Sequence, residues 1–118
     1  MNVMAMDYYR GIDYGDAAVQ AAQSTFTQLK SLYPARIDAQ LWALVGVTPM
    51  LGQNDDGRIY DQADARQLVP FAQGKRLGEL AFWVTTRDRN ACTGAPYMCT
   101  NIPQSPYEFS RIFAAYTG

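Results

Sequence analysis

The chain has 118 residues, of which 48% are hydrophobic and 13% aromatic, and its formal net charge at pH 7 is -1. This composition is typical of one globular domain, here residues 1–118, and the near-neutral charge argues against nucleic acid as a partner. No apolar run approaches the roughly 18 residues of a membrane span, and the absence of histidine removes imidazole bases and most transition-metal sites. We therefore expect no membrane contact, no metal and no cofactor.

The first half of the chain alternates between strand-like and helix-like segments. Apolar residues 3–6 predict a strand, and residues 17–32, rich in Ala and Gln, predict a helix for which Asp16 is a candidate N-cap. The continuous apolar run over 41–47 then predicts a strand buried on both faces. It leads into a polar loop over 48–57, which has turn residues at its tip.

The second half continues the same alternation. Residues 61–73 predict a helix, which Pro70 should kink or shorten, and residues 80–84 predict the third strand. A long loop over 85–104 precedes a final helix over 105–116, which opens with Ser as cap and Pro at its first position. The order βαβαβα predicts an α/β fold in which right-handed crossovers place three strands in one parallel sheet.

Both cysteines of the chain, Cys92 and Cys99, lie in the long loop before the final helix. Their spacing is too wide for a CxxC redox or zinc pair, and no other soft ligand is present to complete a metal site. We expect a disulfide that closes this loop, with two unpaired thiols as the alternative. If the disulfide forms, the parent protein belongs to an oxidising compartment.

Three segments at the predicted strand ends resemble consecutive motifs of the bacterial family 18 glycoside hydrolases, the chitinases. They are Asn-Val-Met-Ala-Met-Asp-Tyr at 2–8, Val-Gly-Val-Thr-Pro-Met-Leu-Gly-Gln-Asn-Asp at 45–55, and Phe-Trp-Val-Thr-Thr-Arg-Asp-Arg-Asn at 82–90. The segment 99–110 also resembles that family's final loop and helix. The resemblance implies a partial TIM barrel that comprises strands six, seven and eight of the family's eight.

The parent family is secreted, whereas this N-terminus lacks a basic segment followed by an apolar core, so the chain is expected to carry no secretory signal. The family's catalytic motif, Asp-x-x-Asp-x-Asp-x-Glu, is also missing. In the family its last Glu protonates the glycosidic oxygen, and the N-acetyl group of the substrate acts as nucleophile. The only glutamates here are Glu79, at the start of a predicted strand, and Glu108, in the first turn of a helix. We therefore expect a truncated chitinase-like barrel that lacks hydrolysis by itself.

The strand ends that this chain does contain are expected to form a sugar-binding surface. The resemblance assigns Asp7 and Tyr8 to the N-acetyl group and Trp83 to stacking against the pyranose ring. Gln53 and Asn54 could donate hydrogen bonds to sugar hydroxyl groups. In the alternative interpretation Trp83 belongs to the core and Asp7 caps a turn. The expected partner is chitin or a chito-oligosaccharide.

A three-stranded sheet with helices on one side also leaves its other face open. Met4, Met6 and either Phe82 or Trp83 are expected on that face, where apolar contact with water would drive self-association into a homodimer or a higher oligomer. We expect this association to complete the partial barrel.

Two other functions stay open on the sequence alone. Copies of the chain could assemble an active glycoside hydrolase in which carboxylates such as Asp7 and Asp55 meet across the interface. Alternatively, the chain is an assembly-only fragment with no ligand. The run Asp55-Asp56-Gly57 is interpreted as a solvated turn and not a calcium site, because its acids lack EF-hand spacing.

Overall fold

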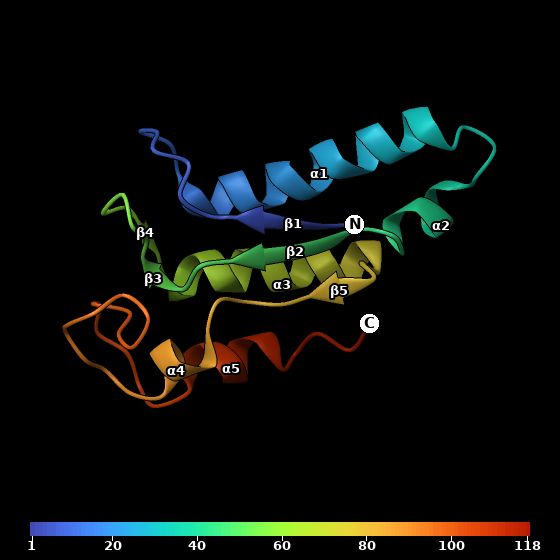
Figure 1. Ribbon diagram of the computed structural model, residues 1–118. Helices are drawn as coiled ribbons and strands as arrows, with labels where there is room; N and C mark the ends of the chain where they lie inside the picture. The colour runs from blue at the N-terminus through green and yellow to red at the C-terminus, as the bar shows by residue number, and fades with distance from the viewer.

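The main sheet is parallel and runs through the centre of the molecule (Figure 1). The computed structural model describes residues 1–118. The sheet order is β1–β2–β5, formed by β1 (Asn2–Ala5), β2 (Gly46–Pro49) and β5 (Glu79–Leu80). In register, Asn2 lies opposite Gly46, which in turn lies opposite Glu79. A second, antiparallel pair is formed by β3 (Gly52–Gln53) and β4 (Ile59–Tyr60). The predicted α/β class and the three-stranded parallel sheet are confirmed.

The helices are α1 (Tyr14–Leu32), α2 (Asp38–Trp42), α3 (Gln62–Lys75), α4 (Thr85–Asp88) and α5 (Glu108–Phe113). Helix α1 packs on β1 and β2 and against α3, which contacts α5. The core lies between these helices and the sheet, and its fully buried apolar side chains include Tyr60, Phe109, Leu41, Leu51, Leu68, Val45 and Val47. None of the helices combines the length and the hydrophobicity that crossing a membrane requires.

The second strand lies later in the chain than the apolar run over 41–47 predicts. Leu41 and Trp42 belong to α2, and the strand itself is β2. Leu41 is fully buried, and the Trp42 ring stacks on Phe26 of α1 with the ring centroids 4.1 Å apart. A short apolar run fits a helix packed on the core as well as a buried strand. The pattern therefore predicted the burial of Leu41 and of residues 45–47 but not the helix, in which Trp42 is half-buried, or the exposure of Ala43.

The third strand is shorter than predicted, and the helix after β4 is longer. Of the predicted strand 80–84, only Leu80 lies in β5, although Trp83 still forms a parallel bridge with Met50. Helix α3 continues past Pro70 to Lys75. Pro70 lies on the exposed side of the helix, where the carbonyl group that it leaves without an N–H partner can bond water.

Both of the predicted helix caps are displaced. Helix α1 is capped by Asp13, whose carboxylate accepts the N–H of Asp16 at 2.8 Å. Asp16 instead lies in the first turn, where a negative charge complements the helix dipole. The predicted cap of the last helix, Ser105, lies three residues before α5 begins.

The N-terminus of α5 is held by a carboxylate from a different helix. Asp88, at the end of α4, is fully buried and accepts the N–H groups of Phe109 at 2.9 Å and of Ser110 at 2.7 Å. It also accepts the Ser110 hydroxyl at 2.5 Å and the side-chain amide of Gln104 at 3.0 Å. Because these bonds satisfy the first donors of α5, the helix begins later than the Ser-Pro signal predicts.

The open face of the sheet is less apolar than the sequence suggests. Alternate residues of a strand point to opposite faces, and Asn2, Met4 and Thr48 point away from the core. The Thr48 hydroxyl donates to Oδ1 of Asn2 at 2.8 Å on this face. Met4 is 66% exposed, Met6 is half-buried, and Phe82 packs against the core instead. The apolar area that would drive self-association is therefore smaller than expected.

Candidate functional site

The carboxyl ends of β1, β2 and β5 point in the same direction (Figure 1). The β3–β4 hairpin and the start of α1 lie at this same end of the molecule, together with α4 and the loop over 89–104. The loop predicted over 85–104 therefore begins with a short helix, α4. Parallel sheets in α/β proteins present their ligand-binding residues at this edge. All of the predicted site residues follow or end these strands, namely Asp7, Tyr8, Gln53, Asn54 and Trp83. The free groups on their side chains therefore determine which ligand this edge can bind.

One carboxylate oxygen of Asp7 is hydrogen-bonded within the protein, and the other is free. Its N–H donates to Oδ1 of Asn54 at 3.1 Å, and its Oδ1 accepts the N–H of Asp55 at 2.8 Å. Its Oδ2 has no hydrogen-bond partner within the protein. Burial raises the pKa of Asp7, and the charges of Asp55 and Asp56 add to that rise, against the lowering effects of the Asp55 N–H and of Arg87. The free oxygen is available to a ligand.

Asn54 is fully occupied by the protein itself. It is 3% exposed, and its amide nitrogen donates to the carbonyl oxygens of Met50 at 3.1 Å and Gly52 at 3.2 Å. Its amide oxygen accepts the N–H of Asp7. The side chain therefore fastens the turn after β2 to the end of β1, and no donor is left for a sugar hydroxyl.

Gln53 is the amide with free hydrogen-bonding groups. Its backbone is held on both sides, because its N–H donates to the carbonyl oxygen of Thr100 at 2.8 Å and its own carbonyl accepts from Arg87 at 2.6 Å. Its half-buried side chain makes no hydrogen bond to the protein. Gln53 thus combines a fixed backbone with an amide that a ligand can reach.

Tyr8 points toward the core. Its ring meets the Tyr14 ring edge-on at 5.3 Å between centroids, and its N–H donates to the Tyr14 hydroxyl at 3.0 Å. The Tyr8 hydroxyl is buried without a partner, and burial raises its pKa. Tyr9, in contrast, is 72% exposed. The pair Tyr8–Tyr14 therefore supports the chain segment that carries Asp7.

The turn at the tip of the β3–β4 hairpin is anchored by Asp56. This carboxylate accepts the Tyr14 hydroxyl, the N–H of Tyr9 at 2.9 Å and the N–H of Arg58 at 3.0 Å. Burial opposes ionisation, but these bonds outweigh it and lower the pKa of Asp56. Burial and the bond to Asp56 raise the pKa of Tyr14 to about 12. Gly57 completes the turn at a φ of +83°, a value that favours glycine.

An open pocket of about 470 Å³ lies beside this turn. It is lined by Ile12, Asp13, Tyr14, Asp56, Gly57, Arg58 and Ile59. No group of three or more His, Cys, Asp or Glu side chains in the structure could hold a metal ion.

Trp83 is fixed through its backbone while its ring stays half-exposed. Its N–H donates to the carbonyl oxygen of Pro49 at 2.9 Å, and its own carbonyl accepts the N–H of Leu51 at 3.0 Å. The peptide bond between Trp83 and Val84 is cis. The guanidinium carbon of Arg87 lies 5.4 Å from the centroid of the Trp83 ring, a separation at which cation–π attraction operates. The ring is thus presented on a rigid support.

Arg87 was missed by the sequence analysis. It is fully buried and donates to the carbonyl oxygens of Leu51, Gln53 at 2.6 Å and Pro96 at 2.5 Å. Burial lowers its pKa, an effect that the nearby charges of Asp55 and Asp7 oppose. The available signal was its place in the segment 82–90, directly after the third strand, although charged residues after a strand are usually solvated.

Neither glutamate lies at this edge. Glu79 opens β5, at the amino end of the sheet, and Glu108 lies in the first turn of α5 as predicted. The Glu108 carboxylate accepts the Gln62 side chain at 2.9 Å and the N–H of Ser105 at 3.0 Å. The bond from Gln62 is the main cause of its lowered pKa. The strand-end site therefore contains aspartates but no glutamate.

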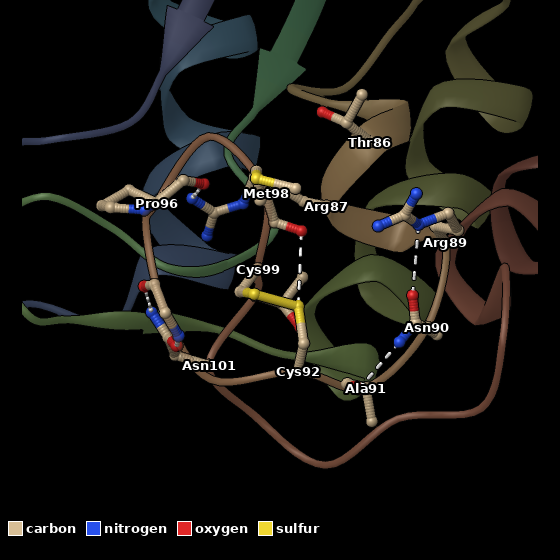
Figure 2. Close-up of a disulfide and its surroundings, with 12 residues drawn as sticks. Thr86, Arg87, Arg89, Asn90, Ala91, Cys92, Pro96, Met98, Cys99 and Asn101 are labelled. Carbon is tan, nitrogen blue, oxygen red and sulfur yellow. Dashed lines mark hydrogen bonds between the residues drawn. A yellow bond between two sulfur atoms is a disulfide. The ribbon is translucent and has the colours of Figure 1, made fainter.

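The predicted disulfide between Cys92 and Cys99 is confirmed, with 5.2 Å between the two Cα atoms. Figure 2 shows the loop that it closes, with the Arg87 side chain directed at Pro96. The Thr86 hydroxyl donates to the carbonyl oxygen of Tyr97 at 2.8 Å. The disulfide loop, residues 92–99, is therefore tied to α4 at two neighbouring carbonyl groups.

The chain is similar to chitinases in both sequence and structure. It is 34% identical to a probable bifunctional chitinase/lysozyme of Escherichia coli K12 over 99% of its own length, and 36% identical to endochitinase 11 of Metarhizium anisopliae over 75%. The structure matches active domain 2 of a thermostable chitinase from Pyrococcus furiosus, solved as catalytic-site mutants with chito-oligosaccharides, with a TM-score of 0.89 and 35% identity. A second structure of the Pyrococcus furiosus catalytic domain gives 0.88 and 34%.

These matches cover between 75% and 99% of this chain but less than half of each relative. The chain spans 15% and 19% of the two curated relatives, and 38% and 40% of the two solved chains. No protein-family model matches it. The chain is therefore chitinase-like, and what the larger proteins do as a whole reaches it only as a proposal.

Proposed function

We propose that these residues form the last three βα units of a family 18 glycoside hydrolase barrel, and that their strand ends bind N-acetylglucosamine polymers without hydrolysing them unaided. The observation that carries the proposal is the half-exposed Trp83 ring, held rigidly at the carboxyl edge of a chitinase-like sheet. Aromatic faces suit the apolar face of a pyranose ring. The disulfide is consistent with an oxidising compartment.

The neighbouring polar groups supply the remaining contacts. Oδ2 of Asp7 accepts a hydrogen bond from the N-acetyl N–H or from a hydroxyl group, and the Gln53 amide can both donate and accept. Asn54 and Tyr8 position the segment that carries Asp7 and do not themselves contact sugar, because the amide of Asn54 is occupied and Tyr8 points into the core.

Binding is tested by calorimetric titration with chito-oligosaccharides. We expect Trp83→Ala to weaken binding by about tenfold, since stacking on an aromatic ring contributes on the order of 1.5 kcal/mol. Tyr33→Ala is the matched control, because Tyr33 is also an exposed aromatic but lies at the far end of α1. Equal affinities of the two variants would contradict the proposal.

The expected lack of hydrolysis rests on the missing catalytic motif, because neither glutamate of the chain lies at this edge to serve as the general acid. A general acid contributes roughly 10²–10⁴-fold to rate, so we expect no release of a chromophore from a chitobioside above background. Steady release that Asp7→Ala abolishes would instead support an active hydrolase. An oligomer that combines carboxylates such as Asp7 and Asp55 from different copies would then be the better account.

Self-association is the proposed state of these residues when they are isolated. Met4 is exposed on the open face of the sheet, and β1 and β5 both have an unpaired edge, which favours contact with a second copy. Sedimentation equilibrium at micromolar concentration should give at least twice the chain mass of 13.2 kDa, and Met4→Lys should lower it. A monomer at all concentrations would contradict this part of the proposal.

A further inference from the structure

Arg87 connects segments that are far apart in the sequence. One of its terminal nitrogens donates to the carbonyl oxygens of Leu51 and Gln53, and the other donates to Pro96. The first two carbonyls belong to the turn after β2 and to β3, whereas Pro96 belongs to the disulfide loop. A planar guanidinium can satisfy such diverging acceptors at once, which a lysine ammonium on its flexible stem cannot do in the same geometry.

The same guanidinium also lies against the Trp83 ring, which is the proposed sugar platform. It lies 5.4 Å from the centroid of the Trp83 ring, and the side chain is fully buried. Its Nε has no hydrogen-bond partner. A fully buried arginine with an unpartnered donor carries a desolvation cost, so surface solubility does not explain its presence here. Its contacts join the platform to the disulfide loop.

The disulfide loop supplies a rigid attachment point. The Cys92–Cys99 bond closes it, and the Thr86 hydroxyl holds the carbonyl of Tyr97, the residue after Pro96. The carbonyl that Arg87 binds is therefore fixed by a covalent bond on one side and by a hydrogen bond on the other. Opening the disulfide would free this carbonyl to move away from the guanidinium.

We propose that Arg87 is a positioning residue that transmits the geometry of the disulfide loop to the Trp83 ring and to the β2–β3 turn. The state of the disulfide then sets how firmly the sugar platform is held. The sugar-binding consequence rests on the proposed function, whereas the coupling between loop and Trp83 does not, so the two are measured separately.

The coupling is measured without sugar, through the emission of Trp83 and its quenching by acrylamide. The chain has two tryptophans, so all variants carry Trp42→Phe, which leaves Trp83 as the reporter. We expect Arg87→Met and Arg87→Lys both to increase quenching of Trp83. Arg89→Met is the matched control, because Arg89 is exposed two residues later and bonds only Asn90, and it should leave quenching unchanged.

A double-mutant cycle then separates positioning from general loosening. Cys92→Ser/Cys99→Ser should increase Trp83 quenching while Arg87 is present and should add little when Arg87→Met is already in place. Fully additive effects, or a disulfide variant with unchanged quenching, would overturn the proposal. Thermal melts accompany each variant. If both Arg87 variants fail to fold, reduction of the disulfide by a dithiol in the Arg87-containing protein decides the question by the same readout.

The sugar measurement is a separate arm of the experiment. If the unsubstituted chain binds chito-oligosaccharide, Arg87→Lys should weaken binding by about tenfold, or 1.4 kcal/mol, although Arg87 is fully buried and offers no exposed group to a sugar. An unchanged affinity would overturn the positioning role. If the unsubstituted chain binds no sugar, the proposed function is wrong, but the quenching measurements still test the coupling between the disulfide loop and Trp83.

Discussion

The two sides of the strand-end site are held together by different chemistry. On the side of β1 and the β3–β4 hairpin, carboxylates make the links, with Asp7 bound to the N–H of Asp55 and Asp56 bound to Tyr14. On the side of the third strand, the links are a buried arginine, a buried aspartate and a disulfide. The links on the first side are exposed or half-buried carboxylates, whereas those on the second side are fully buried charged side chains and a covalent bond. The two sides should therefore fail under different conditions.

The largest effect is expected at Asp88. Asp88→Ala would leave the backbone N–H groups of Phe109 and Ser110 and the Ser110 hydroxyl without this acceptor, at a cost of about 3 kcal/mol or more in the free energy of unfolding. Urea denaturation measures the change. Asp38→Ala is the control, because Asp38 forms an exposed ion pair with Lys30 and should cost less than about 1 kcal/mol. Similar costs for the two variants would mean that the Asp88 bonds do not stabilise the fold.

Removal of the disulfide should have the next largest effect. Cys92→Ser/Cys99→Ser is expected to lower the free energy of unfolding by about 2–3 kcal/mol, because the bond closes only a short loop. The loss should be the same at acidic and neutral pH, since no carboxylate is part of it. A loss that grows as the pH falls would mean that the ionisation of a carboxylate also contributes to the stability of the loop.

A smaller and pH-dependent effect is expected at Tyr14. Tyr14→Phe removes the hydrogen bond to the Asp56 carboxylate and also the acceptor of the Tyr8 N–H. Loss of the bond to Asp56 should cost about 1.5 kcal/mol at neutral pH. The folded-state pKa of Asp56 is lowered, so its ionised form stabilises the fold above the ordinary aspartate pKa and this contribution is lost as the pH falls through the folded-state value. The difference in unfolding free energy between parent and variant should therefore shrink in acid. A constant difference would show that the lost bond does not depend on the ionisation of Asp56.

Much of the fold could be predicted because it follows from local signals. The alternation of segments predicted the parallel sheet, and the two cysteines predicted the bond that forms between them. The apolar run over 41–47 did not predict its own conformation, because Leu41 is buried as part of helix α2 and the Trp42 ring of the same helix stacks on Phe26 of α1. The apolar composition of that segment is visible locally, but the helix partner that it packs against lies in a different part of the chain.

The supporting residues of the site were harder to predict for the same reason. Arg87 and Asp88 are adjacent charged residues, a pattern that normally indicates a solvated surface, yet both are fully buried. Their partners lie far away in the sequence, as with Leu51 for Arg87. Asn54 presents the opposite case, because a polar residue in a strand-end loop suggests a ligand contact, whereas its amide nitrogen donates to backbone carbonyl groups of the protein.

The proposed function depends on binding of N-acetylglucosamine polymers at the carboxyl edge of the sheet. The most direct test is a titration of the ¹⁵N-labelled protein with chitotriose, followed by NMR. We expect chemical-shift changes at the Trp83 indole, the Gln53 side-chain amide and the backbone N–H of Asp7, with none at Lys30 and Tyr33 at the far end of α1. No shifts at saturating sugar, or shifts centred away from this edge, would contradict sugar binding by these residues.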